Sequence, residues 1–450
     1  MAPMSPGDQV FLRNFFQALH YRPLDPEDPQ YVPIYEDDRL ASDDPVQLMA
    51  QAVQWTTGQS VQLLSGFRGT GKSTELRRLR KVLRQAGYRV VLLDIEDYLN
   101  TSVPIDISDF LIVLAGAFGD ELQSVELLGE DPAHESFWDR LAAFCTRTRV
   151  SFDEISAKAG EGVSVGIKAS LKSDPTFKQK LQEKMAGHLG SLVAEVHAYF
   201  SECVARLKAK HLVAAEVVLL VDSVEHIRGT SVNADAVQAS VESLFAIHAD
   251  KLHLPFVHVI YTVPPYLTVR SPNLGILYAP GGVKLLSAVK VRDAESGHLF
   301  QPGLDALEKI VRARGDWQRL LSDRQVLDRL SAMSGGHLRD LLRIVAEIVL
   351  RGVKRLPVPE KVVETALNQV RNEFLPIAES DALWLERVAR SHDPSLVEAA
   401  RLPDLARFLD THLVLCYQNG RSWYDVHPLV LDHIREQVER LERERAAQEG

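Results

Sequence analysis

Short apolar runs that end in polar or glycine residues predict five buried strands. They cover residues 61–64, 88–94, 217–222, 255–262 and 283–291. Continuous apolar runs, in contrast to alternating ones, are typical of parallel strands covered on both faces. Helix-favouring segments lie between them. We therefore expect an α/β fold with a doubly wound parallel sheet and ligand bound at the carboxyl ends of the strands.

Apolar residues at helical spacing predict the remaining elements. A helix over residues 8–20 is expected to dock on the rest of the protein, and a Pro- and Asp-rich extended arm follows it to residue 45. Further helices are expected over 45–56, 75–85, 107–118 and 186–207. Weak alternation with three glycines predicts a hairpin or flexible insertion over 150–172.

The C-terminal part reads as helical. The apolar spacing predicts a helix over residues 334–351, within a small bundle. It predicts three short helices and a hairpin over residues 380–430. The hairpin spans 413–426 around Asn419-Gly420, a strong two-residue turn signal. This order is similar to a winged helix, with a charged helix or frayed end over 435–449. The expected domains are residues 1–45, 46–293 with a helical insertion at about 100–210, 294–373 and 374–450.

The strand at 61–64 leads into Gly66-x-x-x-x-Gly71-Lys72-Ser73, and a helix follows at once. This is the context that a phosphate-binding P-loop requires. Glycines let backbone N–H groups surround a polyphosphate at a helix N-terminus. Lys72 suits the β- and γ-phosphates, and Ser73 offers a hydroxyl to Mg²⁺. The expected ATP-binding residues are Gly66, Phe67, Arg68, Gly69, Thr70, Gly71, Lys72, Ser73, Thr74 and Asp222.

Asp222 ends the run Val217-Val-Leu-Leu-Val221. A carboxylate at the end of a buried parallel strand, about 150 residues after a P-loop, is expected to help hold Mg²⁺ in the Walker B role. The predicted cofactors are therefore ATP and Mg²⁺, with Ser73 and Asp222 as the metal-binding residues.

Composition narrows the class of protein. With 46% hydrophobic and 25% charged residues, the chain is typical of a soluble globular protein. No apolar run approaches the about 20 residues that span a bilayer, and we expect a cytoplasmic protein without a membrane partner. Three distant cysteines show no metal-ligand spacing, and the histidines form no recognisable metal motif. The net charge of −10 weighs against non-specific nucleic-acid binding.

Together, Gly66–Ser73, Val217–Asp222, the strand ending at Thr262 and Gly335-Gly-His-Leu-Arg339 resemble the AAA+ and STAND P-loop ATPases. The likeness is to the branch with origin-recognition ATPases and prokaryotic STAND proteins. It covers residues 40–430 and implies an ATPase core, a helical lid and a winged helix. It also implies that Thr262 takes the sensor-1 position and that Arg339 is sensor 2, a lid arginine on the γ-phosphate. A planar guanidinium suits phosphate independently of the likeness.

The sequence departs from this family at Ser223, where AAA+ enzymes usually carry the glutamate that polarises water. Glu225 and Glu96 are the two candidate bases, with Glu225 slightly favoured. If neither serves, hydrolysis is slow and ATP acts as a switch ligand. The resemblance also implies self-association, with Arg270 or Arg228 as an arginine supplied to a neighbouring subunit.

Two functions remain open. The first is a regulatory ATPase that switches conformation with ATP or ADP, or acts as an assembly factor, for a protein partner. The second is a DNA-associated ATPase that uses the winged helix. The expected recognition helix, 402–412, carries Arg407 but also Asp404 and Asp410, a poor balance for phosphate contacts. Protein docking is therefore favoured. A small metabolic kinase has no need for a lid and a winged helix.

Overall fold

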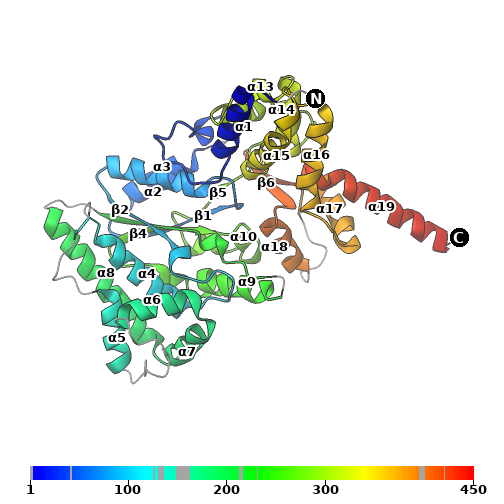
Figure 1. The fold of residues 1–450 in the computed structure, drawn as a ribbon. Helices are drawn as coiled ribbons and strands as arrows, with labels where there is room; N and C mark the ends of the chain where they lie inside the picture. The colour runs from blue at the N-terminus through cyan, green and yellow to red at the C-terminus, as the bar shows by residue number, and fades with distance from the viewer. Residues whose placement is uncertain are drawn as a thin grey trace. The chain divides into compact units, whose positions relative to one another are not determined.

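The computed structural model describes residues 4–40, 43–124, 127–129, 136–147, 163–211, 216–230, 232–394, 401–419 and 421–449. The chain forms two compact units, which are described separately (Figure 1). Unit 1 contains residues 1–45, 66–74 and 285–450, and unit 2 contains residues 46–65 and 75–284. The P-loop segment therefore belongs to the same unit as the N-terminal arm and the C-terminal region.

A five-stranded sheet with the order β2-β3-β4-β1-β5 organises unit 2. Its strands are β1 (Ser60–Gly66), β2 (Arg89–Asp94), β3 (Val217–Asp222), β4 (Val257–Val263) and β5 (Val283–Leu286). Strands β2, β3, β4 and β1 pair in parallel, with Asp94 beside Asp222 and Leu64 beside Thr262. β3 and β4 are buried along their whole length, as continuous apolar runs require.

The five expected strands are confirmed, but the fifth is shorter than predicted. It ends at Leu286, whereas the apolar run continues to residue 291. Beyond β5 the backbone makes other hydrogen bonds: Ala288 N–H donates to the carbonyl of Cys416, and Val289 N–H donates to the carbonyl of Gly336. Ala288 and Val289 therefore lie outside the sheet and hydrogen-bond to later residues of unit 1.

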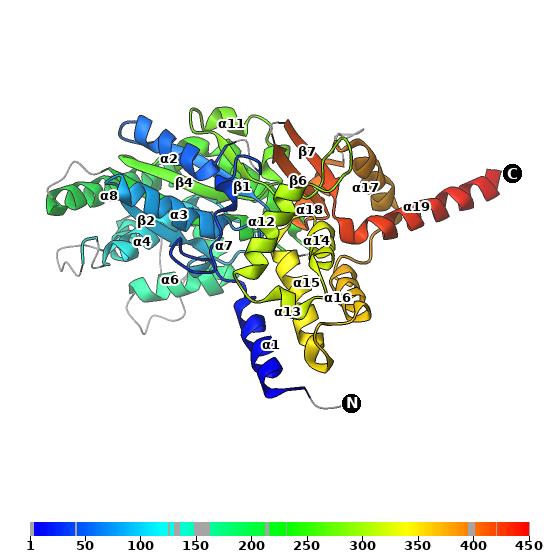
Figure 2. The same cartoon turned by 90° about the horizontal axis from the view of Figure 1, so that it is seen from above.

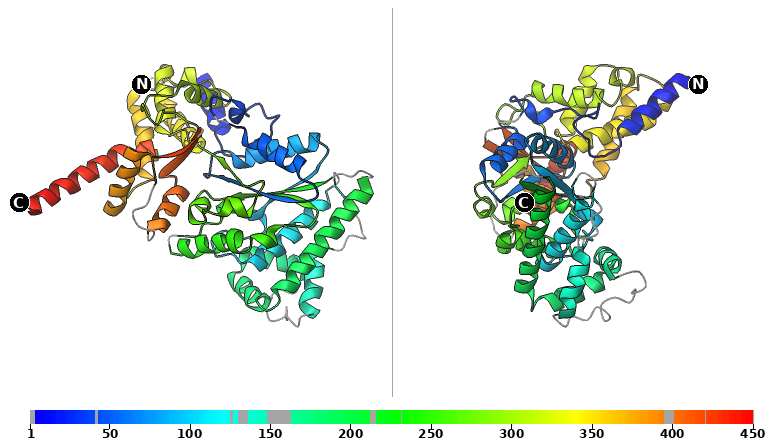
Figure 3. Two further views of the ribbon diagram at one scale, coloured as in Figure 1. Left: turned by 180° about the vertical axis from the view of Figure 1, so that it is seen from behind. Right: turned by 90° about the vertical axis from the view of Figure 1, so that its left-hand side faces the viewer.

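Helices cover both faces of the sheet, which confirms the doubly wound arrangement. α2 (Pro45–Trp55) and α3 (Lys72–Gln85) lie on one face, and α4 (Ile107–Leu122), α8 (Leu189–His211) and α9 (Ala234–Glu242) lie on the other (Figures 1 and 3). The shorter helices of unit 2 are η2 (Ile95–Asp97), η3 (Val224–His226), η4 (Ser243–Ile247), η5 (Ala249–Leu252), α10 (Leu267–Arg270) and α11 (Leu274–Leu277).

The insertion after β2 is helical. Besides α4 and α8 it contains α5 (Phe137–Arg147), α6 (Val163–Ser173) and α7 (Pro175–Met185). The expected hairpin or flexible segment at 150–172 is wrong from residue 163 onward, because Ile167 and Leu171 are buried one helical turn apart on α6. Residues 150–162 lie outside the described residues. The half-buried carboxylate of Asp120 joins three parts of the insertion by accepting from Tyr98, Trp138 and Lys168.

Unit 1 contains the helices of the predicted lid, residues 294–373. They are α12 (Gln301–Arg312), α13 (Trp317–Leu320), α14 (Arg324–Met333), α15 (Leu338–Arg351), η6 (Gly352–Lys354) and α16 (Glu360–Asn372). The expected docking helix is α1 (Pro6–Ala18), which packs against α15 (Figure 2). The arm after it contains one short helix, η1 (Ile34–Glu36).

The C-terminal region of unit 1 contains α17 (Glu379–Ser391), α18 (Leu402–Asp410), the hairpin β6 (Val414–Asn419) and β7 (Arg421–Val426), and α19 (Pro428–Glu449). The antiparallel pairing of β6 and β7 confirms the expected hairpin. α19 packs against α17 and then continues as an exposed helix beyond Leu441 (Figure 3). Whether this region is a winged helix stays a prediction. Among the described helices, none combines the length and apolar character needed to cross a bilayer.

A glycine pair holds the start of α15 close to the strand-like segment after β5. Gly335 and Gly336 have φ values of +60° and +72°, which L-residues rarely adopt. A Cβ on Gly336 would lie 1.8 Å from the carbonyl oxygen of Val289. Both backbone conformation and space therefore require glycine at residue 336.

We expect Gly336→Ala to destabilise the protein by about 3 kcal/mol or more, because it adds both strain and a backbone clash. Chemical denaturation followed by circular dichroism measures the change. Gly275→Ala is the matched control, since nothing lies within 4 Å of the added methyl group. We expect that control to stay within about 0.5 kcal/mol of the wild type. Equal stability of the two variants would contradict the packing described here.

Candidate nucleotide-binding site

The P-loop has the strand, loop and helix order that the sequence predicts. β1 ends at Gly66 and α3 begins at Lys72. Between them Gly69 and Gly71 have φ values of +101° and +100°, conformations that only glycine adopts without strain. The loop thus turns its backbone into the first turn of α3, where helix N–H groups and the helix dipole favour an anion.

The side chains of the loop divide into buried supports and polar groups. The ammonium of Lys72 is 3% exposed and donates to the carbonyl oxygens of Gly66 (2.8 Å) and Phe67 (2.7 Å). Thr70 Oγ1 donates to the carbonyl of Phe67 at 2.9 Å, and the Phe67 ring is buried. Phe67 and Thr70 therefore shape the loop, and Phe67 offers a ligand only its backbone. Ser73 follows Lys72 in the first turn of α3.

The N-terminal arm is bonded directly to the P-loop. The Tyr35 hydroxyl lies 3.1 Å from the carbonyl oxygens of both Thr70 and Ser287. The backbone N–H of Leu24 donates to Thr74 Oγ1 at 3.1 Å. The arm therefore fixes the loop from outside. The sequence shows it only as a Pro- and Asp-rich stretch.

Arg339, the predicted sensor 2, lies on the P-loop within unit 1. A Cβ built on Gly69 would be 2.6 Å from the Cβ of Arg339 and 2.9 Å from its Nε. The guanidinium also lies over the ring of Tyr21, 5.3 Å from its centroid. Gly69 is therefore needed for a second reason, because only a residue without a side chain admits Arg339 at this distance.

Arg68 brings a second positive charge to the same place. Burial and then the nearby charge of Arg68 lower the pKa of Arg339. Among the described residues, the buried Nε of Arg68 has no hydrogen-bond partner. Two neighbouring guanidinium groups repel each other, and an anion between or beside them removes that cost. The residues present thus fit a polyphosphate, which supplies several acceptor oxygens and negative charge.

Next to Arg339, three histidines surround one buried carboxylate. Asp340 Oδ2 lies 2.7 Å from His337 Nδ1 and 3.2 Å from the Nε2 atoms of both His412 and His427. Burial opposes ionisation of Asp340, but these histidines outweigh it and hold the pKa of its carboxyl well below the usual range. Burial lowers the pKa of His412 and of His427. His337 Nε2 lies 2.9 Å from the carbonyl oxygen of Arg68, which connects this cluster to the P-loop.

The predicted Walker B and sensor-1 residues meet at the edge of the sheet in unit 2. Asp222 ends β3, and Ser223 follows with a left-handed φ of 66°. This turn directs the N–H of Val224 to Thr262 Oγ1, at 3.1 Å, and the N–H of Ser223 to Asp222 Oδ1, at 2.8 Å. Thr262 is fully buried, so its hydroxyl has a clear structural task in holding the turn after Asp222.

Both candidate bases flank His226, also in unit 2. Glu96 Oε1 lies 2.8 Å from His226 Nδ1, and Glu225 Oε1 lies 3.9 Å from His226 Nε2. Glu225 is 6% exposed, whereas the Glu96 side chain is 42% exposed. The sequence assigns no role to His226, although it directly follows Glu225.

The two arginines expected to serve a neighbouring subunit differ in their surroundings. Arg270 Nε lies 2.8 Å from Glu242 Oε2, an ion pair within the chain that the sequence does not reveal. The backbone N–H of Arg228 donates to the carbonyl of Thr101 after η3. To reach a neighbouring subunit, Arg270 would have to break its ion pair with Glu242.

The expected site residues thus fall into two sets. Unit 1 brings together the P-loop residues and Arg339, while unit 2 brings together Asp222, Thr262, Glu96 and Glu225. Sequence reasoning missed Tyr35, His226 and the histidine cluster. The spacing of His337 and Asp340, three residues apart at the start of a helix, is the one signal that the sequence carried for that cluster.

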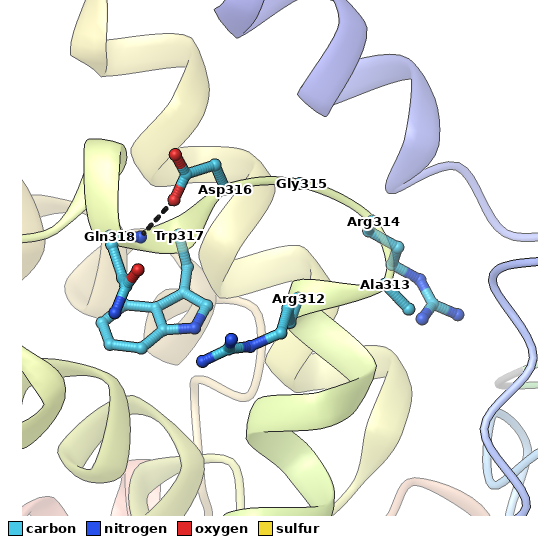
Figure 4. A pocket seen from close by; sticks show the side chains of 7 residues that line it. All are labelled: Arg312, Ala313, Arg314, Gly315, Asp316, Trp317 and Gln318. Atoms are coloured by element: carbon cyan, nitrogen blue, oxygen red, sulfur yellow. Dashed lines mark hydrogen bonds between the residues drawn. The ribbon is translucent and has the colours of Figure 1, made fainter.

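A pocket of ≈390 Å³ lies elsewhere in unit 1. Residues 312–318, between α12 and α13, form it (Figure 4). Asp316 caps α13 by accepting from the N–H of Gln318 at 3.1 Å, and Trp317 Nε1 donates to Glu308 at 2.7 Å. None of the expected site residues lines this pocket, and its polar groups serve the turn itself.

Among family models and curated proteins, none matches this chain. Solved structures do match, at low identity. The Walker-type ATPase paby2304 of Pyrococcus abyssi is 13% identical, with 93% of this chain and 99% of that chain covered and a TM-score of 0.43. The Aeropyrum pernix ORC2 protein in its ADP form is 9% identical, with 94% and 97% covered and a TM-score of 0.44.

A third solved structure, Cdc6p from Pyrobaculum aerophilum, is 13% identical, with 94% of this chain and 98% of that chain covered and a TM-score of 0.38. At these identities and TM-scores, we draw no functional conclusion from the likeness.

We expect Tyr35→Phe to destabilise the protein by about 1–2 kcal/mol, because two carbonyl groups lose a buried donor. Chemical denaturation measures the difference. The control is Tyr21→Phe, whose hydroxyl makes a 3.4 Å contact at an exposed position, with an expected change below about 0.5 kcal/mol. A neutral Tyr35→Phe would show that the arm does not hold the P-loop through this hydroxyl.

Proposed function

We propose that this protein is an ATP-binding P-loop ATPase of the AAA+/STAND type, which acts as a nucleotide-dependent switch or assembly factor for a protein partner. The observation that carries the proposal is the convergence of Arg68 and Arg339 on a glycine loop at the start of α3. Gly69 admits Arg339 only because it has no side chain. A polyphosphate at the loop would offset the repulsion between the two guanidinium groups.

Each residue has a separate task in this proposal. Lys72 turns from the carbonyl oxygens of its own loop to the β- and γ-phosphates, and backbone N–H groups surround them. Ser73 and Asp222 are the proposed ligands of Mg²⁺, which neutralises phosphate charge when bound. Asp222 is assigned from its place at the end of β3, in the sheet whose strand β1 leads into the P-loop.

Arg339 is the proposed link between nucleotide and conformation. It stands one residue before Asp340, on a helix whose neighbour His337 contacts the carbonyl of Arg68. A γ-phosphate adds charge beside Arg339 that ADP lacks. Because a ligand shifts an equilibrium only through its differential affinity for the two states, ATP and ADP then favour different positions of α15.

Slow hydrolysis suits a switch. Ser223 replaces the usual glutamate, and the candidate bases Glu225 and Glu96 both contact His226. We retain Glu225 as the favoured base, because it is buried, whereas the Glu96 side chain on η2 is 42% exposed. A slow turnover leaves the ATP-bound state populated long enough to engage a partner. Self-association, with Arg228 or Arg270 reaching a neighbour, belongs to the same proposal.

The alternative, DNA binding through the C-terminal region, is less favoured. On α18 Arg407 Nη2 lies 2.9 Å from Asp381 and 3.3 Å from Asp404. Just before α18, Arg401 Nε lies 3.0 Å from Asp404. These cations are already balanced by acids, and a phosphate backbone has to compete with them. Protein docking needs no such exchange.

Nucleotide binding is expected to depend on Lys72 and Arg339 in different ways. Lys72→Ala should weaken both ATP and ADP at least about 10-fold, since it removes a charge on the β-phosphate. Arg339→Ala should weaken ATP about 10-fold and ADP less, because its proposed contact is the γ-phosphate. Titration with fluorescent ATP and ADP analogues measures both.

The matched control is Arg351→Ala, at the far end of the same helix, where the arginine pairs with Glu347. It should leave both affinities unchanged. Equal losses of ATP and ADP in Arg339→Ala would remove its role as a nucleotide sensor, and unchanged binding in Lys72→Ala would remove the proposed site.

Steady-state ATP turnover, measured with Lys72→Ala as the blank, tests the proposed chemistry and the alternative together. We expect slow turnover that duplex DNA does not stimulate. Glu225→Gln should lower it at least about 10-fold without affecting ATP binding, because an amide cannot accept the proton of water. Glu96→Gln is the comparison, with a smaller expected loss. Stimulation by DNA would favour the DNA-associated ATPase, and a larger loss in Glu96→Gln would exchange the two roles.

A further inference from the structure

The cluster of His337, Asp340, His412 and His427 is not required by the proposed nucleotide chemistry. Its members come from three places in unit 1: the start of α15, the turn after α18 and the turn before α19. His337, Asp340 and His427 are fully buried, and the His412 side chain is 20% exposed. Three imidazole groups brought to one buried carboxylate oxygen need a chemical reason.

The hydrogen bonds of His337 indicate that a positive species lies between its ring and the Asp340 carboxylate. Its Nε2 lies 2.9 Å from the carbonyl oxygen of Arg68, an acceptor, so Nε2 carries a hydrogen. In the neutral ring Nδ1 then presents a lone pair, yet it lies 2.7 Å from Asp340 Oδ2. Two lone pairs repel at this distance. A positive species, either a proton or a metal ion, therefore lies between them.

His427 is different, because its tautomer is accounted for. Its Nδ1 accepts from the backbone N–H of Leu429 at 3.3 Å, which leaves the hydrogen on Nε2. That Nε2–H faces Asp340 Oδ2 at 3.2 Å and donates to it. His427 is therefore a hydrogen-bond donor to the carboxylate and is not itself placed as a ligand.

His412 is held in the cluster at some backbone cost. Its φ is 48°, a left-handed conformation that is uncommon for non-glycine residues, although histidine, asparagine and aspartate adopt it more often than the others. Its ring stacks on that of His337, with centroids 4.5 Å apart and planes at 18°. Strained backbone at a polar cluster is typical of a functional site.

We propose that His337 Nδ1, His412 Nε2 and Asp340 Oδ2 bind one divalent transition-metal ion of the Zn²⁺ class. These three atoms lie within 4.8 Å of one another. In a tetrahedral zinc site the ligand atoms are about 3.3 Å apart. The distance to Asp340 Oδ2 is 3.2 Å from His412 Nε2 and 2.7 Å from His337 Nδ1, so an ion requires His337 and Asp340 to separate by about 0.6 Å. Imidazole nitrogen and carboxylate oxygen are ordinary zinc ligands, and a water molecule from the His412 side completes the coordination.

The surrounding contacts match those of metal-binding histidines. A ligating histidine usually donates its other ring N–H to a carbonyl or carboxylate, as His337 does to Arg68, and ligating carboxylates are themselves hydrogen-bonded, as Asp340 is by His427. The ion would therefore join the start of α15 to the turn after α18, while His337 keeps its bond to the P-loop.

The test uses Co²⁺ as a spectroscopic substitute for Zn²⁺, with the full chain freed of metal by a chelator and no nucleotide present. We expect one equivalent of Co²⁺ to produce the intense visible absorption of a four-coordinate ion, and Zn²⁺ to displace it. His412→Gln should abolish the band. His427→Phe, which removes only a bond to the ligating carboxylate, should weaken binding about 10- to 100-fold.

Three further variants complete the experiment. His298→Gln, an exposed histidine of unit 1, should retain the band. His412→Cys keeps a ligand and should retain binding while adding a sulfur-to-cobalt charge-transfer band, which carries the test if His412→Gln fails to fold. Lys72→Ala should bind Co²⁺ normally, which separates this site from the nucleotide site. No visible band in the wild type, or the same band in His412→Gln, would overturn the proposal and leave a proton as the shared positive species.

Discussion

The close approach of α15 to the P-loop is the constraint on which the rest of unit 1 depends. It consists of two contacts: the His337 ring meets the carbonyl of Arg68, and the Arg339 side chain passes within van der Waals range of Gly69. The second contact does not tolerate a side chain at residue 69. The φ of +101° at Gly69 and the Arg339 side chain packed against it both require glycine at this position, where the start of α15 lies directly on the P-loop.

Burial of Asp340 extends this constraint to the C-terminal region. A buried carboxylate without partners costs several kcal/mol, so the chain must supply donors or a cation wherever α15 begins. His337 comes from the same helix, but His412 and His427 come from the ends of α18 and α19. The polar cluster therefore helps to fix which turns face the start of α15, because the imidazoles of His412 and His427 both contact the Asp340 carboxylate. Tyr417 adds to this by donating to the carbonyl of Gly335 at 2.7 Å.

The sheet and the P-loop were predictable because both have local signals. The strands are mostly apolar runs, and the loop requires its glycines wherever it occurs. The start of the 163–173 helix was not, since glycines at 160, 162 and 166 obscure the spacing of Ile167 and Leu171. The end of β5 depends on Cys416 and Gly336, far away in the sequence, and no local pattern reports such partners.

The site shows the same division. The expected roles of Lys72 and Asp222 are evident from the residues that flank them in the sequence. In contrast, the contacts of Tyr35 with Thr70 and of His412 with Asp340 join positions 35 and 72 residues apart. A tyrosine in a proline-rich arm and a histidine after a short helix have no distinguishing neighbours. Their roles arise from contact alone, and only the folded chain supplies contact.

The turn after β3 bears on the proposed slow hydrolysis. Ser223 occupies a left-handed conformation, which a serine adopts at a cost of order 1 kcal/mol or more, and the Val224 N–H held by Thr262 fixes it there. Because of this conformation the chain does not continue as a strand after Asp222. It forms the short helix η3, which contains Glu225 and His226. Phosphate binding needs only the loop, whereas hydrolysis needs an oriented water and a base. Under the proposed function, keeping the first and weakening the second would leave ATP bound as a switch ligand.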